Sequence, residues 1–392
     1  MPHDRDAVIT GIGLISCLGE GVDAHWAALH DFAPVIDDTA FPGYRLHPMA
    51  ELALDKHISK REQRQMEPWQ RFGTYAAGAA LEAAGVKGNT ELLSQMHMIV
   101  AAGGGERDYD ADAAIMSGLP KAADPDAYLN EHLLSDLRPT LFLAQLSNLL
   151  AGNISLVHGV VGSSRTFMGE EASGADAIRI ACARIGAGQG DLFLVGGSYN
   201  AQRPDGLLQY EMGRLLWKQP FAGIWDRQAA GGGILLGSLG CFLVVESRSH
   251  ATARGATALA RIASVASDRC RRGPNEATAN ARKQLAALDG TYEAASAAVI
   301  SGASGAHAAT TEEHALLTEI GLPVRAGATA FGHSLEPAFI ANIALAAMAV
   351  SHGTLFPPLD SAEKPMDAPL RDALVTGWGH WRGEALAHVT TP

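Results

Sequence analysis

The sequence has few of the residues that mark metal sites, redox sites and membrane spans. Its 392 residues include four cysteines, Cys17, Cys182, Cys241 and Cys270, and none stands in a Cys-x-x-Cys pair. We therefore expect no metal site and no redox pair, and free thiols in a reducing cytoplasm. No run of about 18 apolar residues is present, so no membrane span is expected. Residues 1–13 also lack the basic and apolar stretches of a signal peptide.

Charged residues are also scarce, at 18%, and aromatic residues make up 6% of the chain. The net charge of −12 gives no bulk attraction for nucleic acid or for an anionic membrane surface. Apolar residues reach 47%, which excludes a mainly disordered chain and is enough to build a large core.

Short apolar runs that end near glycine alternate with longer stretches rich in small residues. Such runs are typical of strands buried on both faces, and the alternation indicates an α/β layered fold. The expected strands are Ala7–Gly13, Met98–Gly105, Leu192–Gly197, Cys241–Glu246, Ala297–Gly302 and Ala373–Gly379. The expected helices are Met66–Gly85, Ser173–Gly188 and Glu336–Gly353, each closed by a glycine.

Two polar segments interrupt this pattern. Asp108–Asp136 is acidic and is expected to be an irregular cap or interface loop, and Arg248–Asn280 is expected to be a surface connection. A boundary near residue 250 divides the chain into halves 1–250 and 251–392, which we expect to form one compact unit.

Four segments, in this order, resemble the ketoacyl-acyl carrier protein synthase branch of the thiolase superfamily. They are AVITGIGLISCLGEG at the N-terminus, residues 137–166, residues 173–197, and the pair FGHSL (331–335) and GWG (377–379). The resemblance implies a thiolase fold in which two βαβ-type halves form a five-layer αβαβα sandwich. It also implies decarboxylative Claisen condensation by a cysteine, two histidines and a lysine.

Most of those catalytic groups are missing here. The resemblance aligns the family's cysteine with Glu171, its first histidine with Gly302 and its lysine with Ala328, and only the second histidine remains, as His333. Cys182 is expected to be a buried residue in the middle of a helix and not a displaced nucleophile. His307 is expected to be a solvated loop histidine, and Glu313 to be structural. Thr376 stands where the family has a gating phenylalanine, beside Gly377, Trp378 and Gly379.

The loss of three groups on an intact scaffold resembles the chain-length factor of type II polyketide synthases, of the aryl-polyene type. That resemblance implies a noncatalytic subunit that pairs with an active ketosynthase, as a heterodimer or heterotetramer, and needs no cofactor. Acyl carrier protein is expected to dock mainly on the partner, because this chain is acidic. The implied tunnel-end residues follow Gly103–Gly105 and are Arg107, Tyr109, Ala113 and Met116.

Two interpretations of Glu171 remain open. Its carboxylate either caps the following helix at the positive end of the dipole, or remains from a decarboxylase in which His333 polarises a malonyl thioester. The neighbouring Glu170 is expected to raise its pKa if both are buried. The alternative functions are a stand-alone malonyl-thioester decarboxylase or hydrolase, and a homodimeric binding protein.

Overall fold

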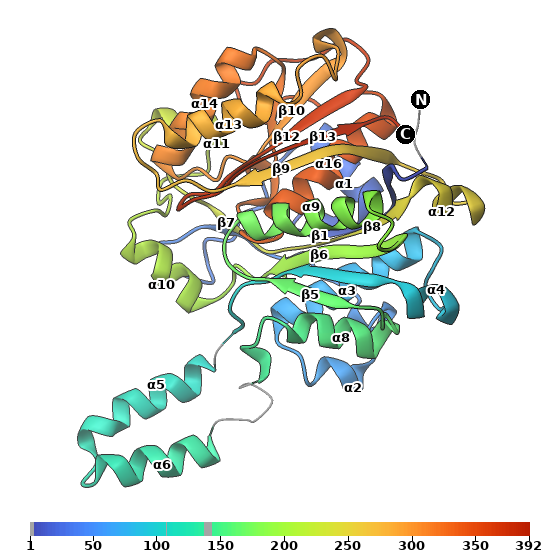
Figure 1. Ribbon diagram of the computed structural model, residues 1–392. Helices are drawn as coiled ribbons and strands as arrows, with labels where there is room; N and C mark the ends of the chain where they lie inside the picture. Colours follow the sequence, from blue (N-terminus) through green and yellow to red (C-terminus); the bar gives the residue numbers. More distant parts are fainter. Residues whose placement is uncertain (1–3, 107, 137–142) are drawn as a thin grey trace.

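Ten strands form one continuous hydrogen-bonded order in the computed structural model, which describes residues 4–106, 108–136 and 143–392 (Figure 1). The order is β11-β10-β12-β13-β9-β1-β8-β6-β4-β5, and the short β2 pairs with β1. The strands from β1 outward are β1 (Ala7–Ser16), β8 (Leu239–Ser247), β6 (Leu192–Tyr199), β4 (His97–Ala101) and β5 (Ser164–Phe167). The strands on the other side are β9 (Ala260–Asp268), β13 (Glu384–Thr390), β12 (Asp372–Trp378), β10 (Ala297–Ser301) and β11 (Val324–Ala326).

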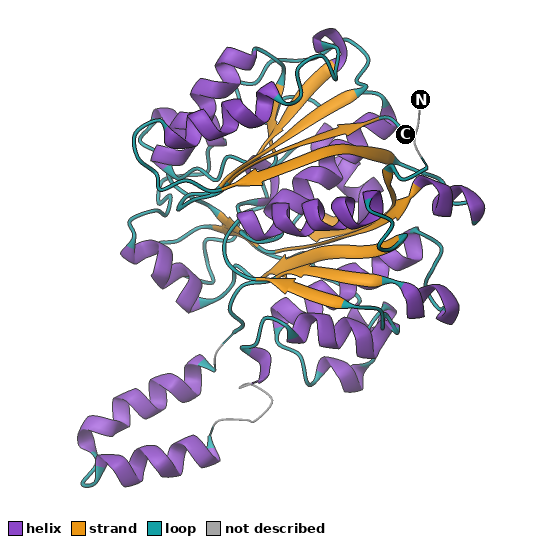
Figure 2. Ribbon diagram, viewed as in Figure 1, coloured by secondary structure: helices purple, strands orange, loops and turns teal. Residues whose placement is uncertain are grey.

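Helices separate and cover these two groups of strands (Figure 2). The helices α9 (Ala172–Gly186) and α16 (Ala338–His352) lie between them. On the outer faces, α3 (Pro68–Ala83) and α8 (Leu149–His158) cover the group from β1 to β5, and α13 (Glu276–Ala286) and α14 (His307–Ile320) cover the group from β9 to β11. The α/β fold expected from the sequence is confirmed, with helix and sheet layers alternating.

The central helix α16 explains why its sequence is almost free of charge. Every residue from Phe339 to Val350 is buried, and the helix contacts α9 as well as β8, β9, β12 and β13. A helix that is apolar all round is stable only where it is enclosed on all sides. Its alanines let the two sheets approach it from both faces.

Close approach between β1 and α3 depends on two glycines. A Cβ at Gly13 would lie 1.9 Å from the backbone oxygen of Ala76, and one at Gly11 would lie 2.5 Å from that of Ala80. Only glycine therefore fits at these points of the strand, which explains the Gly-x-Gly spacing in the N-terminal run.

The acidic segment that we expected to be irregular is helical. Residues 109–135 form a hairpin of α5 (Tyr109–Gly118) and α6 (Pro125–Ser135) that projects from the body (Figure 1). Both helices begin at aspartate caps, since Asp108 accepts from the backbone N–H of Ala111 and Asp124 from that of Ala127. The expectation was wrong because capping residues, and not apolar periodicity, define these short polar helices.

The segment expected to be a surface connection contains a central strand. Residues 260–268 form β9, which pairs with β13 along most of its length and with β1 at Ala7–Ile9. The expectation was wrong because β9 alternates apolar and polar residues and forms no continuous apolar run.

The remaining elements are short. They are β2 (Gly19–Glu20), β3 (Leu46–His47), β7 (Leu236–Gly237), α1 (Gly21–His30), α2 (Lys60–Gln63), α4 (Thr90–Gln95), α10 (Pro204–Met212), α11 (Ile224–Ala229), α12 (Arg248–Ala253), α15 (Ala328–Phe331) and the 3₁₀ turns Leu54–Lys56, Leu119–Lys121 and Ala294–Ser296. Among the described residues, no helix combines the length and the apolar character that crossing a membrane requires.

Candidate functional site

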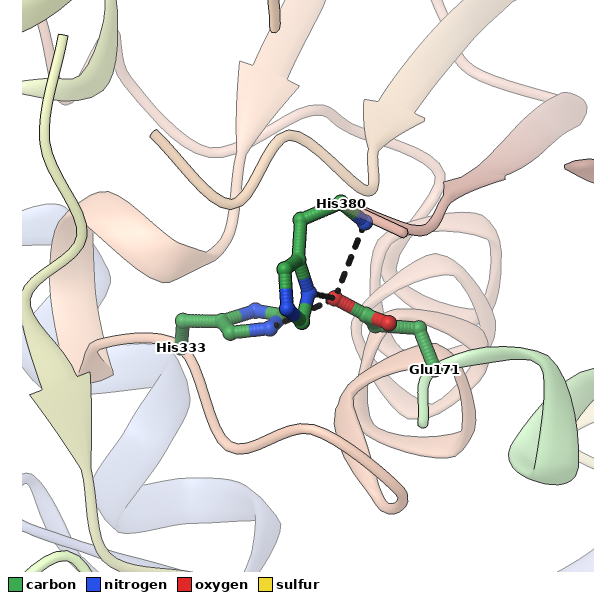
Figure 3. Close-up of side chains that lie close together, drawn as sticks. All are labelled: Glu171, His333 and His380. Carbon is green, nitrogen blue, oxygen red and sulfur yellow. Dashed lines mark hydrogen bonds and ion pairs between the residues drawn. The ribbon is translucent and has the colours of Figure 1, made fainter. Parts of the chain in front are cut away.

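Three side chains from distant parts of the chain meet at Glu171 (Figure 3). Its Oε1 lies 3.0 Å from Nε2 of His333 and 2.8 Å from Nδ1 of His380. The backbone N–H of His380 donates to the same oxygen at 3.3 Å. All three side chains are at most 6% exposed, so the cluster is shielded from solvent.

Glu171 is placed by a tight turn between β5 and α9. Gly169 and Glu170 both have positive φ, at 88° and 56°, and α9 begins at Ala172. Glu171 has helical backbone angles, and its side chain makes no capping hydrogen bond. The expectation that this carboxylate caps the helix was therefore wrong, because the side chain points instead toward the two histidines.

His333 is held by its backbone. Its N–H donates to the carbonyl of Leu235 at 2.7 Å, and its own carbonyl accepts from the N–H of Gly237 at 2.9 Å. The preceding Gly332 has a φ of 77°, and a Cβ there would lie 2.7 Å from the nitrogen of Gly237. Glycine is therefore needed before the histidine, and the ring position follows from strand-like pairing with residues 235–237.

His380 comes from the loop that follows β12. The loop is closed by a hydrogen bond from the N–H of Gly379 to the carbonyl of Gly383 at 2.9 Å, and Arg272 donates to the carbonyl of Gly379. A Cβ at Gly379 would lie 3.2 Å from Oε2 of Glu171, so the loop rests directly on the carboxylate.

The pKa of Glu171 results from opposing effects. Burial raises it, but the hydrogen bonds and charges of His333 and His380 outweigh burial, so the pKa lies well below its ordinary value. Glu170 is only half-buried, and its carboxylate pairs with Arg382 at 3.5 Å. The expected rise in the pKa of Glu171 required both carboxylates to be buried, a condition that Glu170 does not meet, and the two histidines lower the pKa instead.

The positions that the resemblance aligns with the other catalytic groups have defined surroundings. A Cβ at Gly302 would lie 2.4 Å from the backbone oxygen of Thr376, so the backbone itself has no room for a side chain there. The N–H of Gly302 donates to the hydroxyl of Thr376, which in turn donates to Glu313. Ala328 is buried at the start of α15. The gate position is therefore occupied by a buried hydrogen-bonded network.

The other residues of the glycine-rich loop and its surroundings have clear environments. Trp378 is buried, and a Cβ at Gly377 would lie 2.9 Å from the ring of Phe339. Cys182 lies within α9, and burial raises the pKa of its thiol to about 12. His307 is exposed but begins α14, where we had expected a loop.

A cavity of about 540 Å³ borders the cluster, and its lining includes Glu170, His380, Trp381, Gly103–Gly105 and Arg203. Glu336 also lines it, buried against Gly103, where a Cβ would meet its Oε1 at 2.4 Å. Burial raises the pKa of Glu336 to about 7, and the negative charges of Glu171 and Glu170 add to the shift.

The tunnel-end candidates separate into two groups. Tyr109 is half-buried, and its hydroxyl helps to lower the pKa of Asp205, a cavity-lining residue. Ala113 and Met116 are exposed on α5 and do not line the cavity. Arg107 lies outside the described residues.

Comparison with known proteins gives the family. Residues 4–251 match the model for the beta-ketoacyl synthase N-terminal domain. The chain belongs to the beta-ketoacyl synthase family. Among curated relatives of this chain, 3-oxoacyl-[acyl-carrier-protein] synthase 2 of Vibrio cholerae is 25% identical over 273 residues, which cover 66% of this chain and 62% of the relative. The chain thus spans less than two thirds of that relative's length.

Two further matches cover nearly the whole of this chain. The oxytetracycline polyketide beta-ketoacyl synthase 1 of Streptomyces rimosus is 26% identical over 94% of this chain and 90% of its own length. The solved structure of the ishigamide ketosynthase/chain length factor superposes with a TM-score of 0.80 at 20% identity, covering 99% of both chains. The fold is therefore the thiolase-like fold of ketosynthases, as the resemblance predicts.

The sequence analysis missed His380 and Glu336. His380 directly follows the Gly-Trp-Gly segment, so its position in that loop was the available signal. Glu336 stands alone as an acidic residue before the apolar run that becomes α16, and its contact with Gly103 comes from another part of the chain.

Proposed function

We propose that this chain is a noncatalytic chain-length-factor subunit of a heterodimeric ketosynthase. Its partner would elongate acyl chains on an acyl carrier protein by decarboxylative Claisen condensation, in polyketide, aryl-polyene or fatty-acid-like biosynthesis. The proposal rests above all on one observation: the carboxylate of Glu171 accepts hydrogen bonds from the N–H groups of His333 and His380.

Glu171 occupies the donors that a condensation needs. The enolate oxygen that forms when a malonyl thioester loses CO₂ must be stabilised by N–H groups. Here Nε2 of His333, Nδ1 of His380 and the backbone N–H of His380 all face a carboxylate oxygen that is already anionic. A second anion at this point would be repelled, and a carboxylate cannot replace a thiol as a stable acyl acceptor.

The surface supports a partner. The edge strand β5 pairs with β4 on one side only among the described strands, and its first two residues, Ser164 and Arg165, are exposed. Large apolar side chains are also exposed around it, at Leu156 of α8, Val161 and Met168. A free edge flanked by apolar residues is a pairing surface, and obligate interfaces bury about 2,000–5,000 Å². We define β5 with these three residues as the β5 face.

In this assembly the cavity beside Glu171 would join the acyl tunnel of the partner. Tyr109 would contribute from this chain, whereas Ala113 and Met116 on the projecting hairpin would face the partner. Acyl carrier protein would dock mainly on the partner, since this chain carries a net charge of −12 and carrier proteins are acidic.

The test is co-expression with a ketosynthase from the same gene neighbourhood that has its cysteine, both histidines and its lysine. We expect one complex on size exclusion, and acyl-chain elongation only when both chains are present. Mass spectrometry should find acyl groups on the partner's cysteine and none on this chain. Equal elongation, with the same product lengths, by the partner alone would refute the proposal.

The same assay separates the stand-alone alternative. If this chain alone released CO₂ or free malonate from malonyl-acyl carrier protein, and Glu171→Gln abolished that release, a decarboxylase or hydrolase function would replace the proposed one.

A further inference from the structure

Glu171, His333 and His380 have the chemistry of a metal site as well as that of a hydrogen-bonded cluster. One carboxylate oxygen and two imidazole nitrogens, brought from three separate loops, lie within 4.8 Å of one another. Two histidines and one carboxylate form a common set of three protein ligands for zinc. We propose that this cluster binds one divalent transition-metal ion, and that Zn²⁺ is the ion it fits.

The distances suit zinc after a small expansion. Zinc bonds to histidine nitrogen and carboxylate oxygen of about 2.0–2.2 Å place neighbouring tetrahedral ligands ~3.3 Å apart. The present separations from Oε1 of Glu171 are 3.0 Å to His333 and 2.8 Å to His380. Relative to the carboxylate, each nitrogen therefore has to move outward by only a few tenths of an ångström, and the two nitrogens, within 4.8 Å of each other, would converge on the ion.

Two buried atoms of the cluster have unused bonding capacity. Oε2 of Glu171 and Nε2 of His380 are both buried and have no hydrogen-bond partner among the described residues. In the metal-free chain Nδ1 of His380 donates to Glu171, and a metal that binds there would displace that proton; Nε2, which has no partner, can take it up. The unpartnered Oε2 is likewise available for a second bond from the carboxylate to the same metal.

The charges and the cavity also favour a cation. Glu170 and Glu171 lie close enough to raise the pKa of Glu336, so negative charge is concentrated around the cluster. His380 and Glu170 line the adjoining cavity of about 540 Å³. A divalent ion would offset this charge, and the cavity gives it an entry path and a water for the fourth coordination position.

This inference departs from the expectation drawn from cysteine spacing, which gave no sign of metal. It does not rest on the proposed function, because the two ring nitrogens are occupied either by the carboxylate or by the metal, and Glu171 is not a thiol in either case. A metal-loaded chain would still lack a nucleophile for acyl transfer.

The experiment uses the full chain, stripped with a chelator and dialysed. We expect Co²⁺ to give visible absorption bands of a four-coordinate site, one equivalent to bind per chain, and Zn²⁺ to displace it. Calorimetry should give the zinc affinity, and elemental analysis the stoichiometry. Glu171→Gln and His380→Ala should each weaken binding by more than the roughly 10–100-fold that loss of an outer-shell partner costs.

The matched control is His307→Ala, because His307 is an exposed histidine outside the cluster. It should bind zinc as the wild type does, and circular dichroism should show that every variant is folded. If His380→Ala does not fold, the nearly isosteric Glu171→Gln carries the test. The proposal is overturned if the folded wild type binds less than one equivalent, or if Glu171→Gln binds as tightly as the wild type. Elongation with the partner is a separate readout, so either claim can fail alone.

Discussion

The cluster at Glu171 and the β5 face differ in whether their groups have partners within the chain. In the cluster, the N–H groups of His333 and His380 face a carboxylate from the same chain. On the β5 face, a strand edge and the side chains of Leu156, Val161 and Met168 remain exposed. The polar groups of the cluster are thus satisfied within the chain, whereas the apolar groups of the β5 face are not. Under the proposed function, this chain acts through its surface.

The largest effect is expected on the β5 face. Leu156 is 82% exposed, and replacing it by glutamate would put a charge into the proposed interface. Interface residues of this kind contribute about 2 kcal/mol or more, so Leu156→Glu should weaken the complex at least ~30-fold in size-exclusion or calorimetric binding. The matched control is Val35→Glu, which changes another exposed apolar residue. Equal loss of binding in the control would remove the distinction between the two surfaces.

Glu171→Gln should destabilise the isolated chain by about 2–3 kcal/mol at neutral pH, because hydrogen bonds to a charged group are lost inside the protein. The pKa of Glu171 is lowered in the folded state, so its stabilising contribution is present above its ordinary pKa of 4.5 and is lost as the pH falls below that value. The gap in melting temperature between wild type and variant should therefore narrow in acid. A gap that widened there would contradict this account.

Gly302→Ala should cost about 1–3 kcal/mol, because its Cβ would lie 2.4 Å from the backbone oxygen of Thr376. Urea denaturation measures the change. For the same reason, the combined change Glu171→Cys, Gly302→His and Ala328→Lys should not create a synthase. Condensation by a stable triple variant would show that the backbone near Thr376 yields more easily than its contacts imply.

Glu336→Gln should have the smallest effect and the opposite sign. The folded pKa is raised from 4.5 to about 7, so the folded chain loses stability as the pH rises through this window. Each unit of pKa shift costs the folded wild type about 1.4 kcal/mol once Glu336 is ionised. The variant avoids this cost but buries an amide without a hydrogen-bond partner, so we expect it to be more stable by about 1 kcal/mol at pH 8. The gain should vanish at pH 5. A variant that is less stable than the wild type at pH 8 would show that the carboxylate has a partner of its own.

Much of the fold follows from apolar runs in the sequence. All six predicted strands and all three predicted helices form, because strands such as β6 and helices such as α16 are buried on every side and need uninterrupted apolar residues. Elements with one exposed face were missed. The strand β9 alternates polar and apolar residues, and α5 and α6 are short, polar and defined by aspartate caps.

Only part of the candidate site could be predicted, namely the residues that the family resemblance aligns with catalytic groups. Glu171 and His333 follow from the resemblance, yet their contact joins residues 162 positions apart. The orientation of Glu171 depends on the backbone angles of a single turn, and His380 reaches it through a loop whose course is set by glycines. The spacing of residues along the sequence does not predict such contacts between distant segments.

The position of β1 in the sheet order has a consequence for synthesis on the ribosome. This N-terminal strand pairs with β8 and β9, and Leu239 of β8 comes 223 positions after Ser16 at the end of β1. At roughly 5–20 residues per second, the nascent chain carries β1 for roughly 11–45 s before its first long partner exists. During that interval the ten-residue strand has two open edges apart from its short pairing with β2 at Ile15 and Ser16. The chain should therefore depend on chaperones that hold nascent segments, and its yield should rise when translation of residues 17–238 is fast.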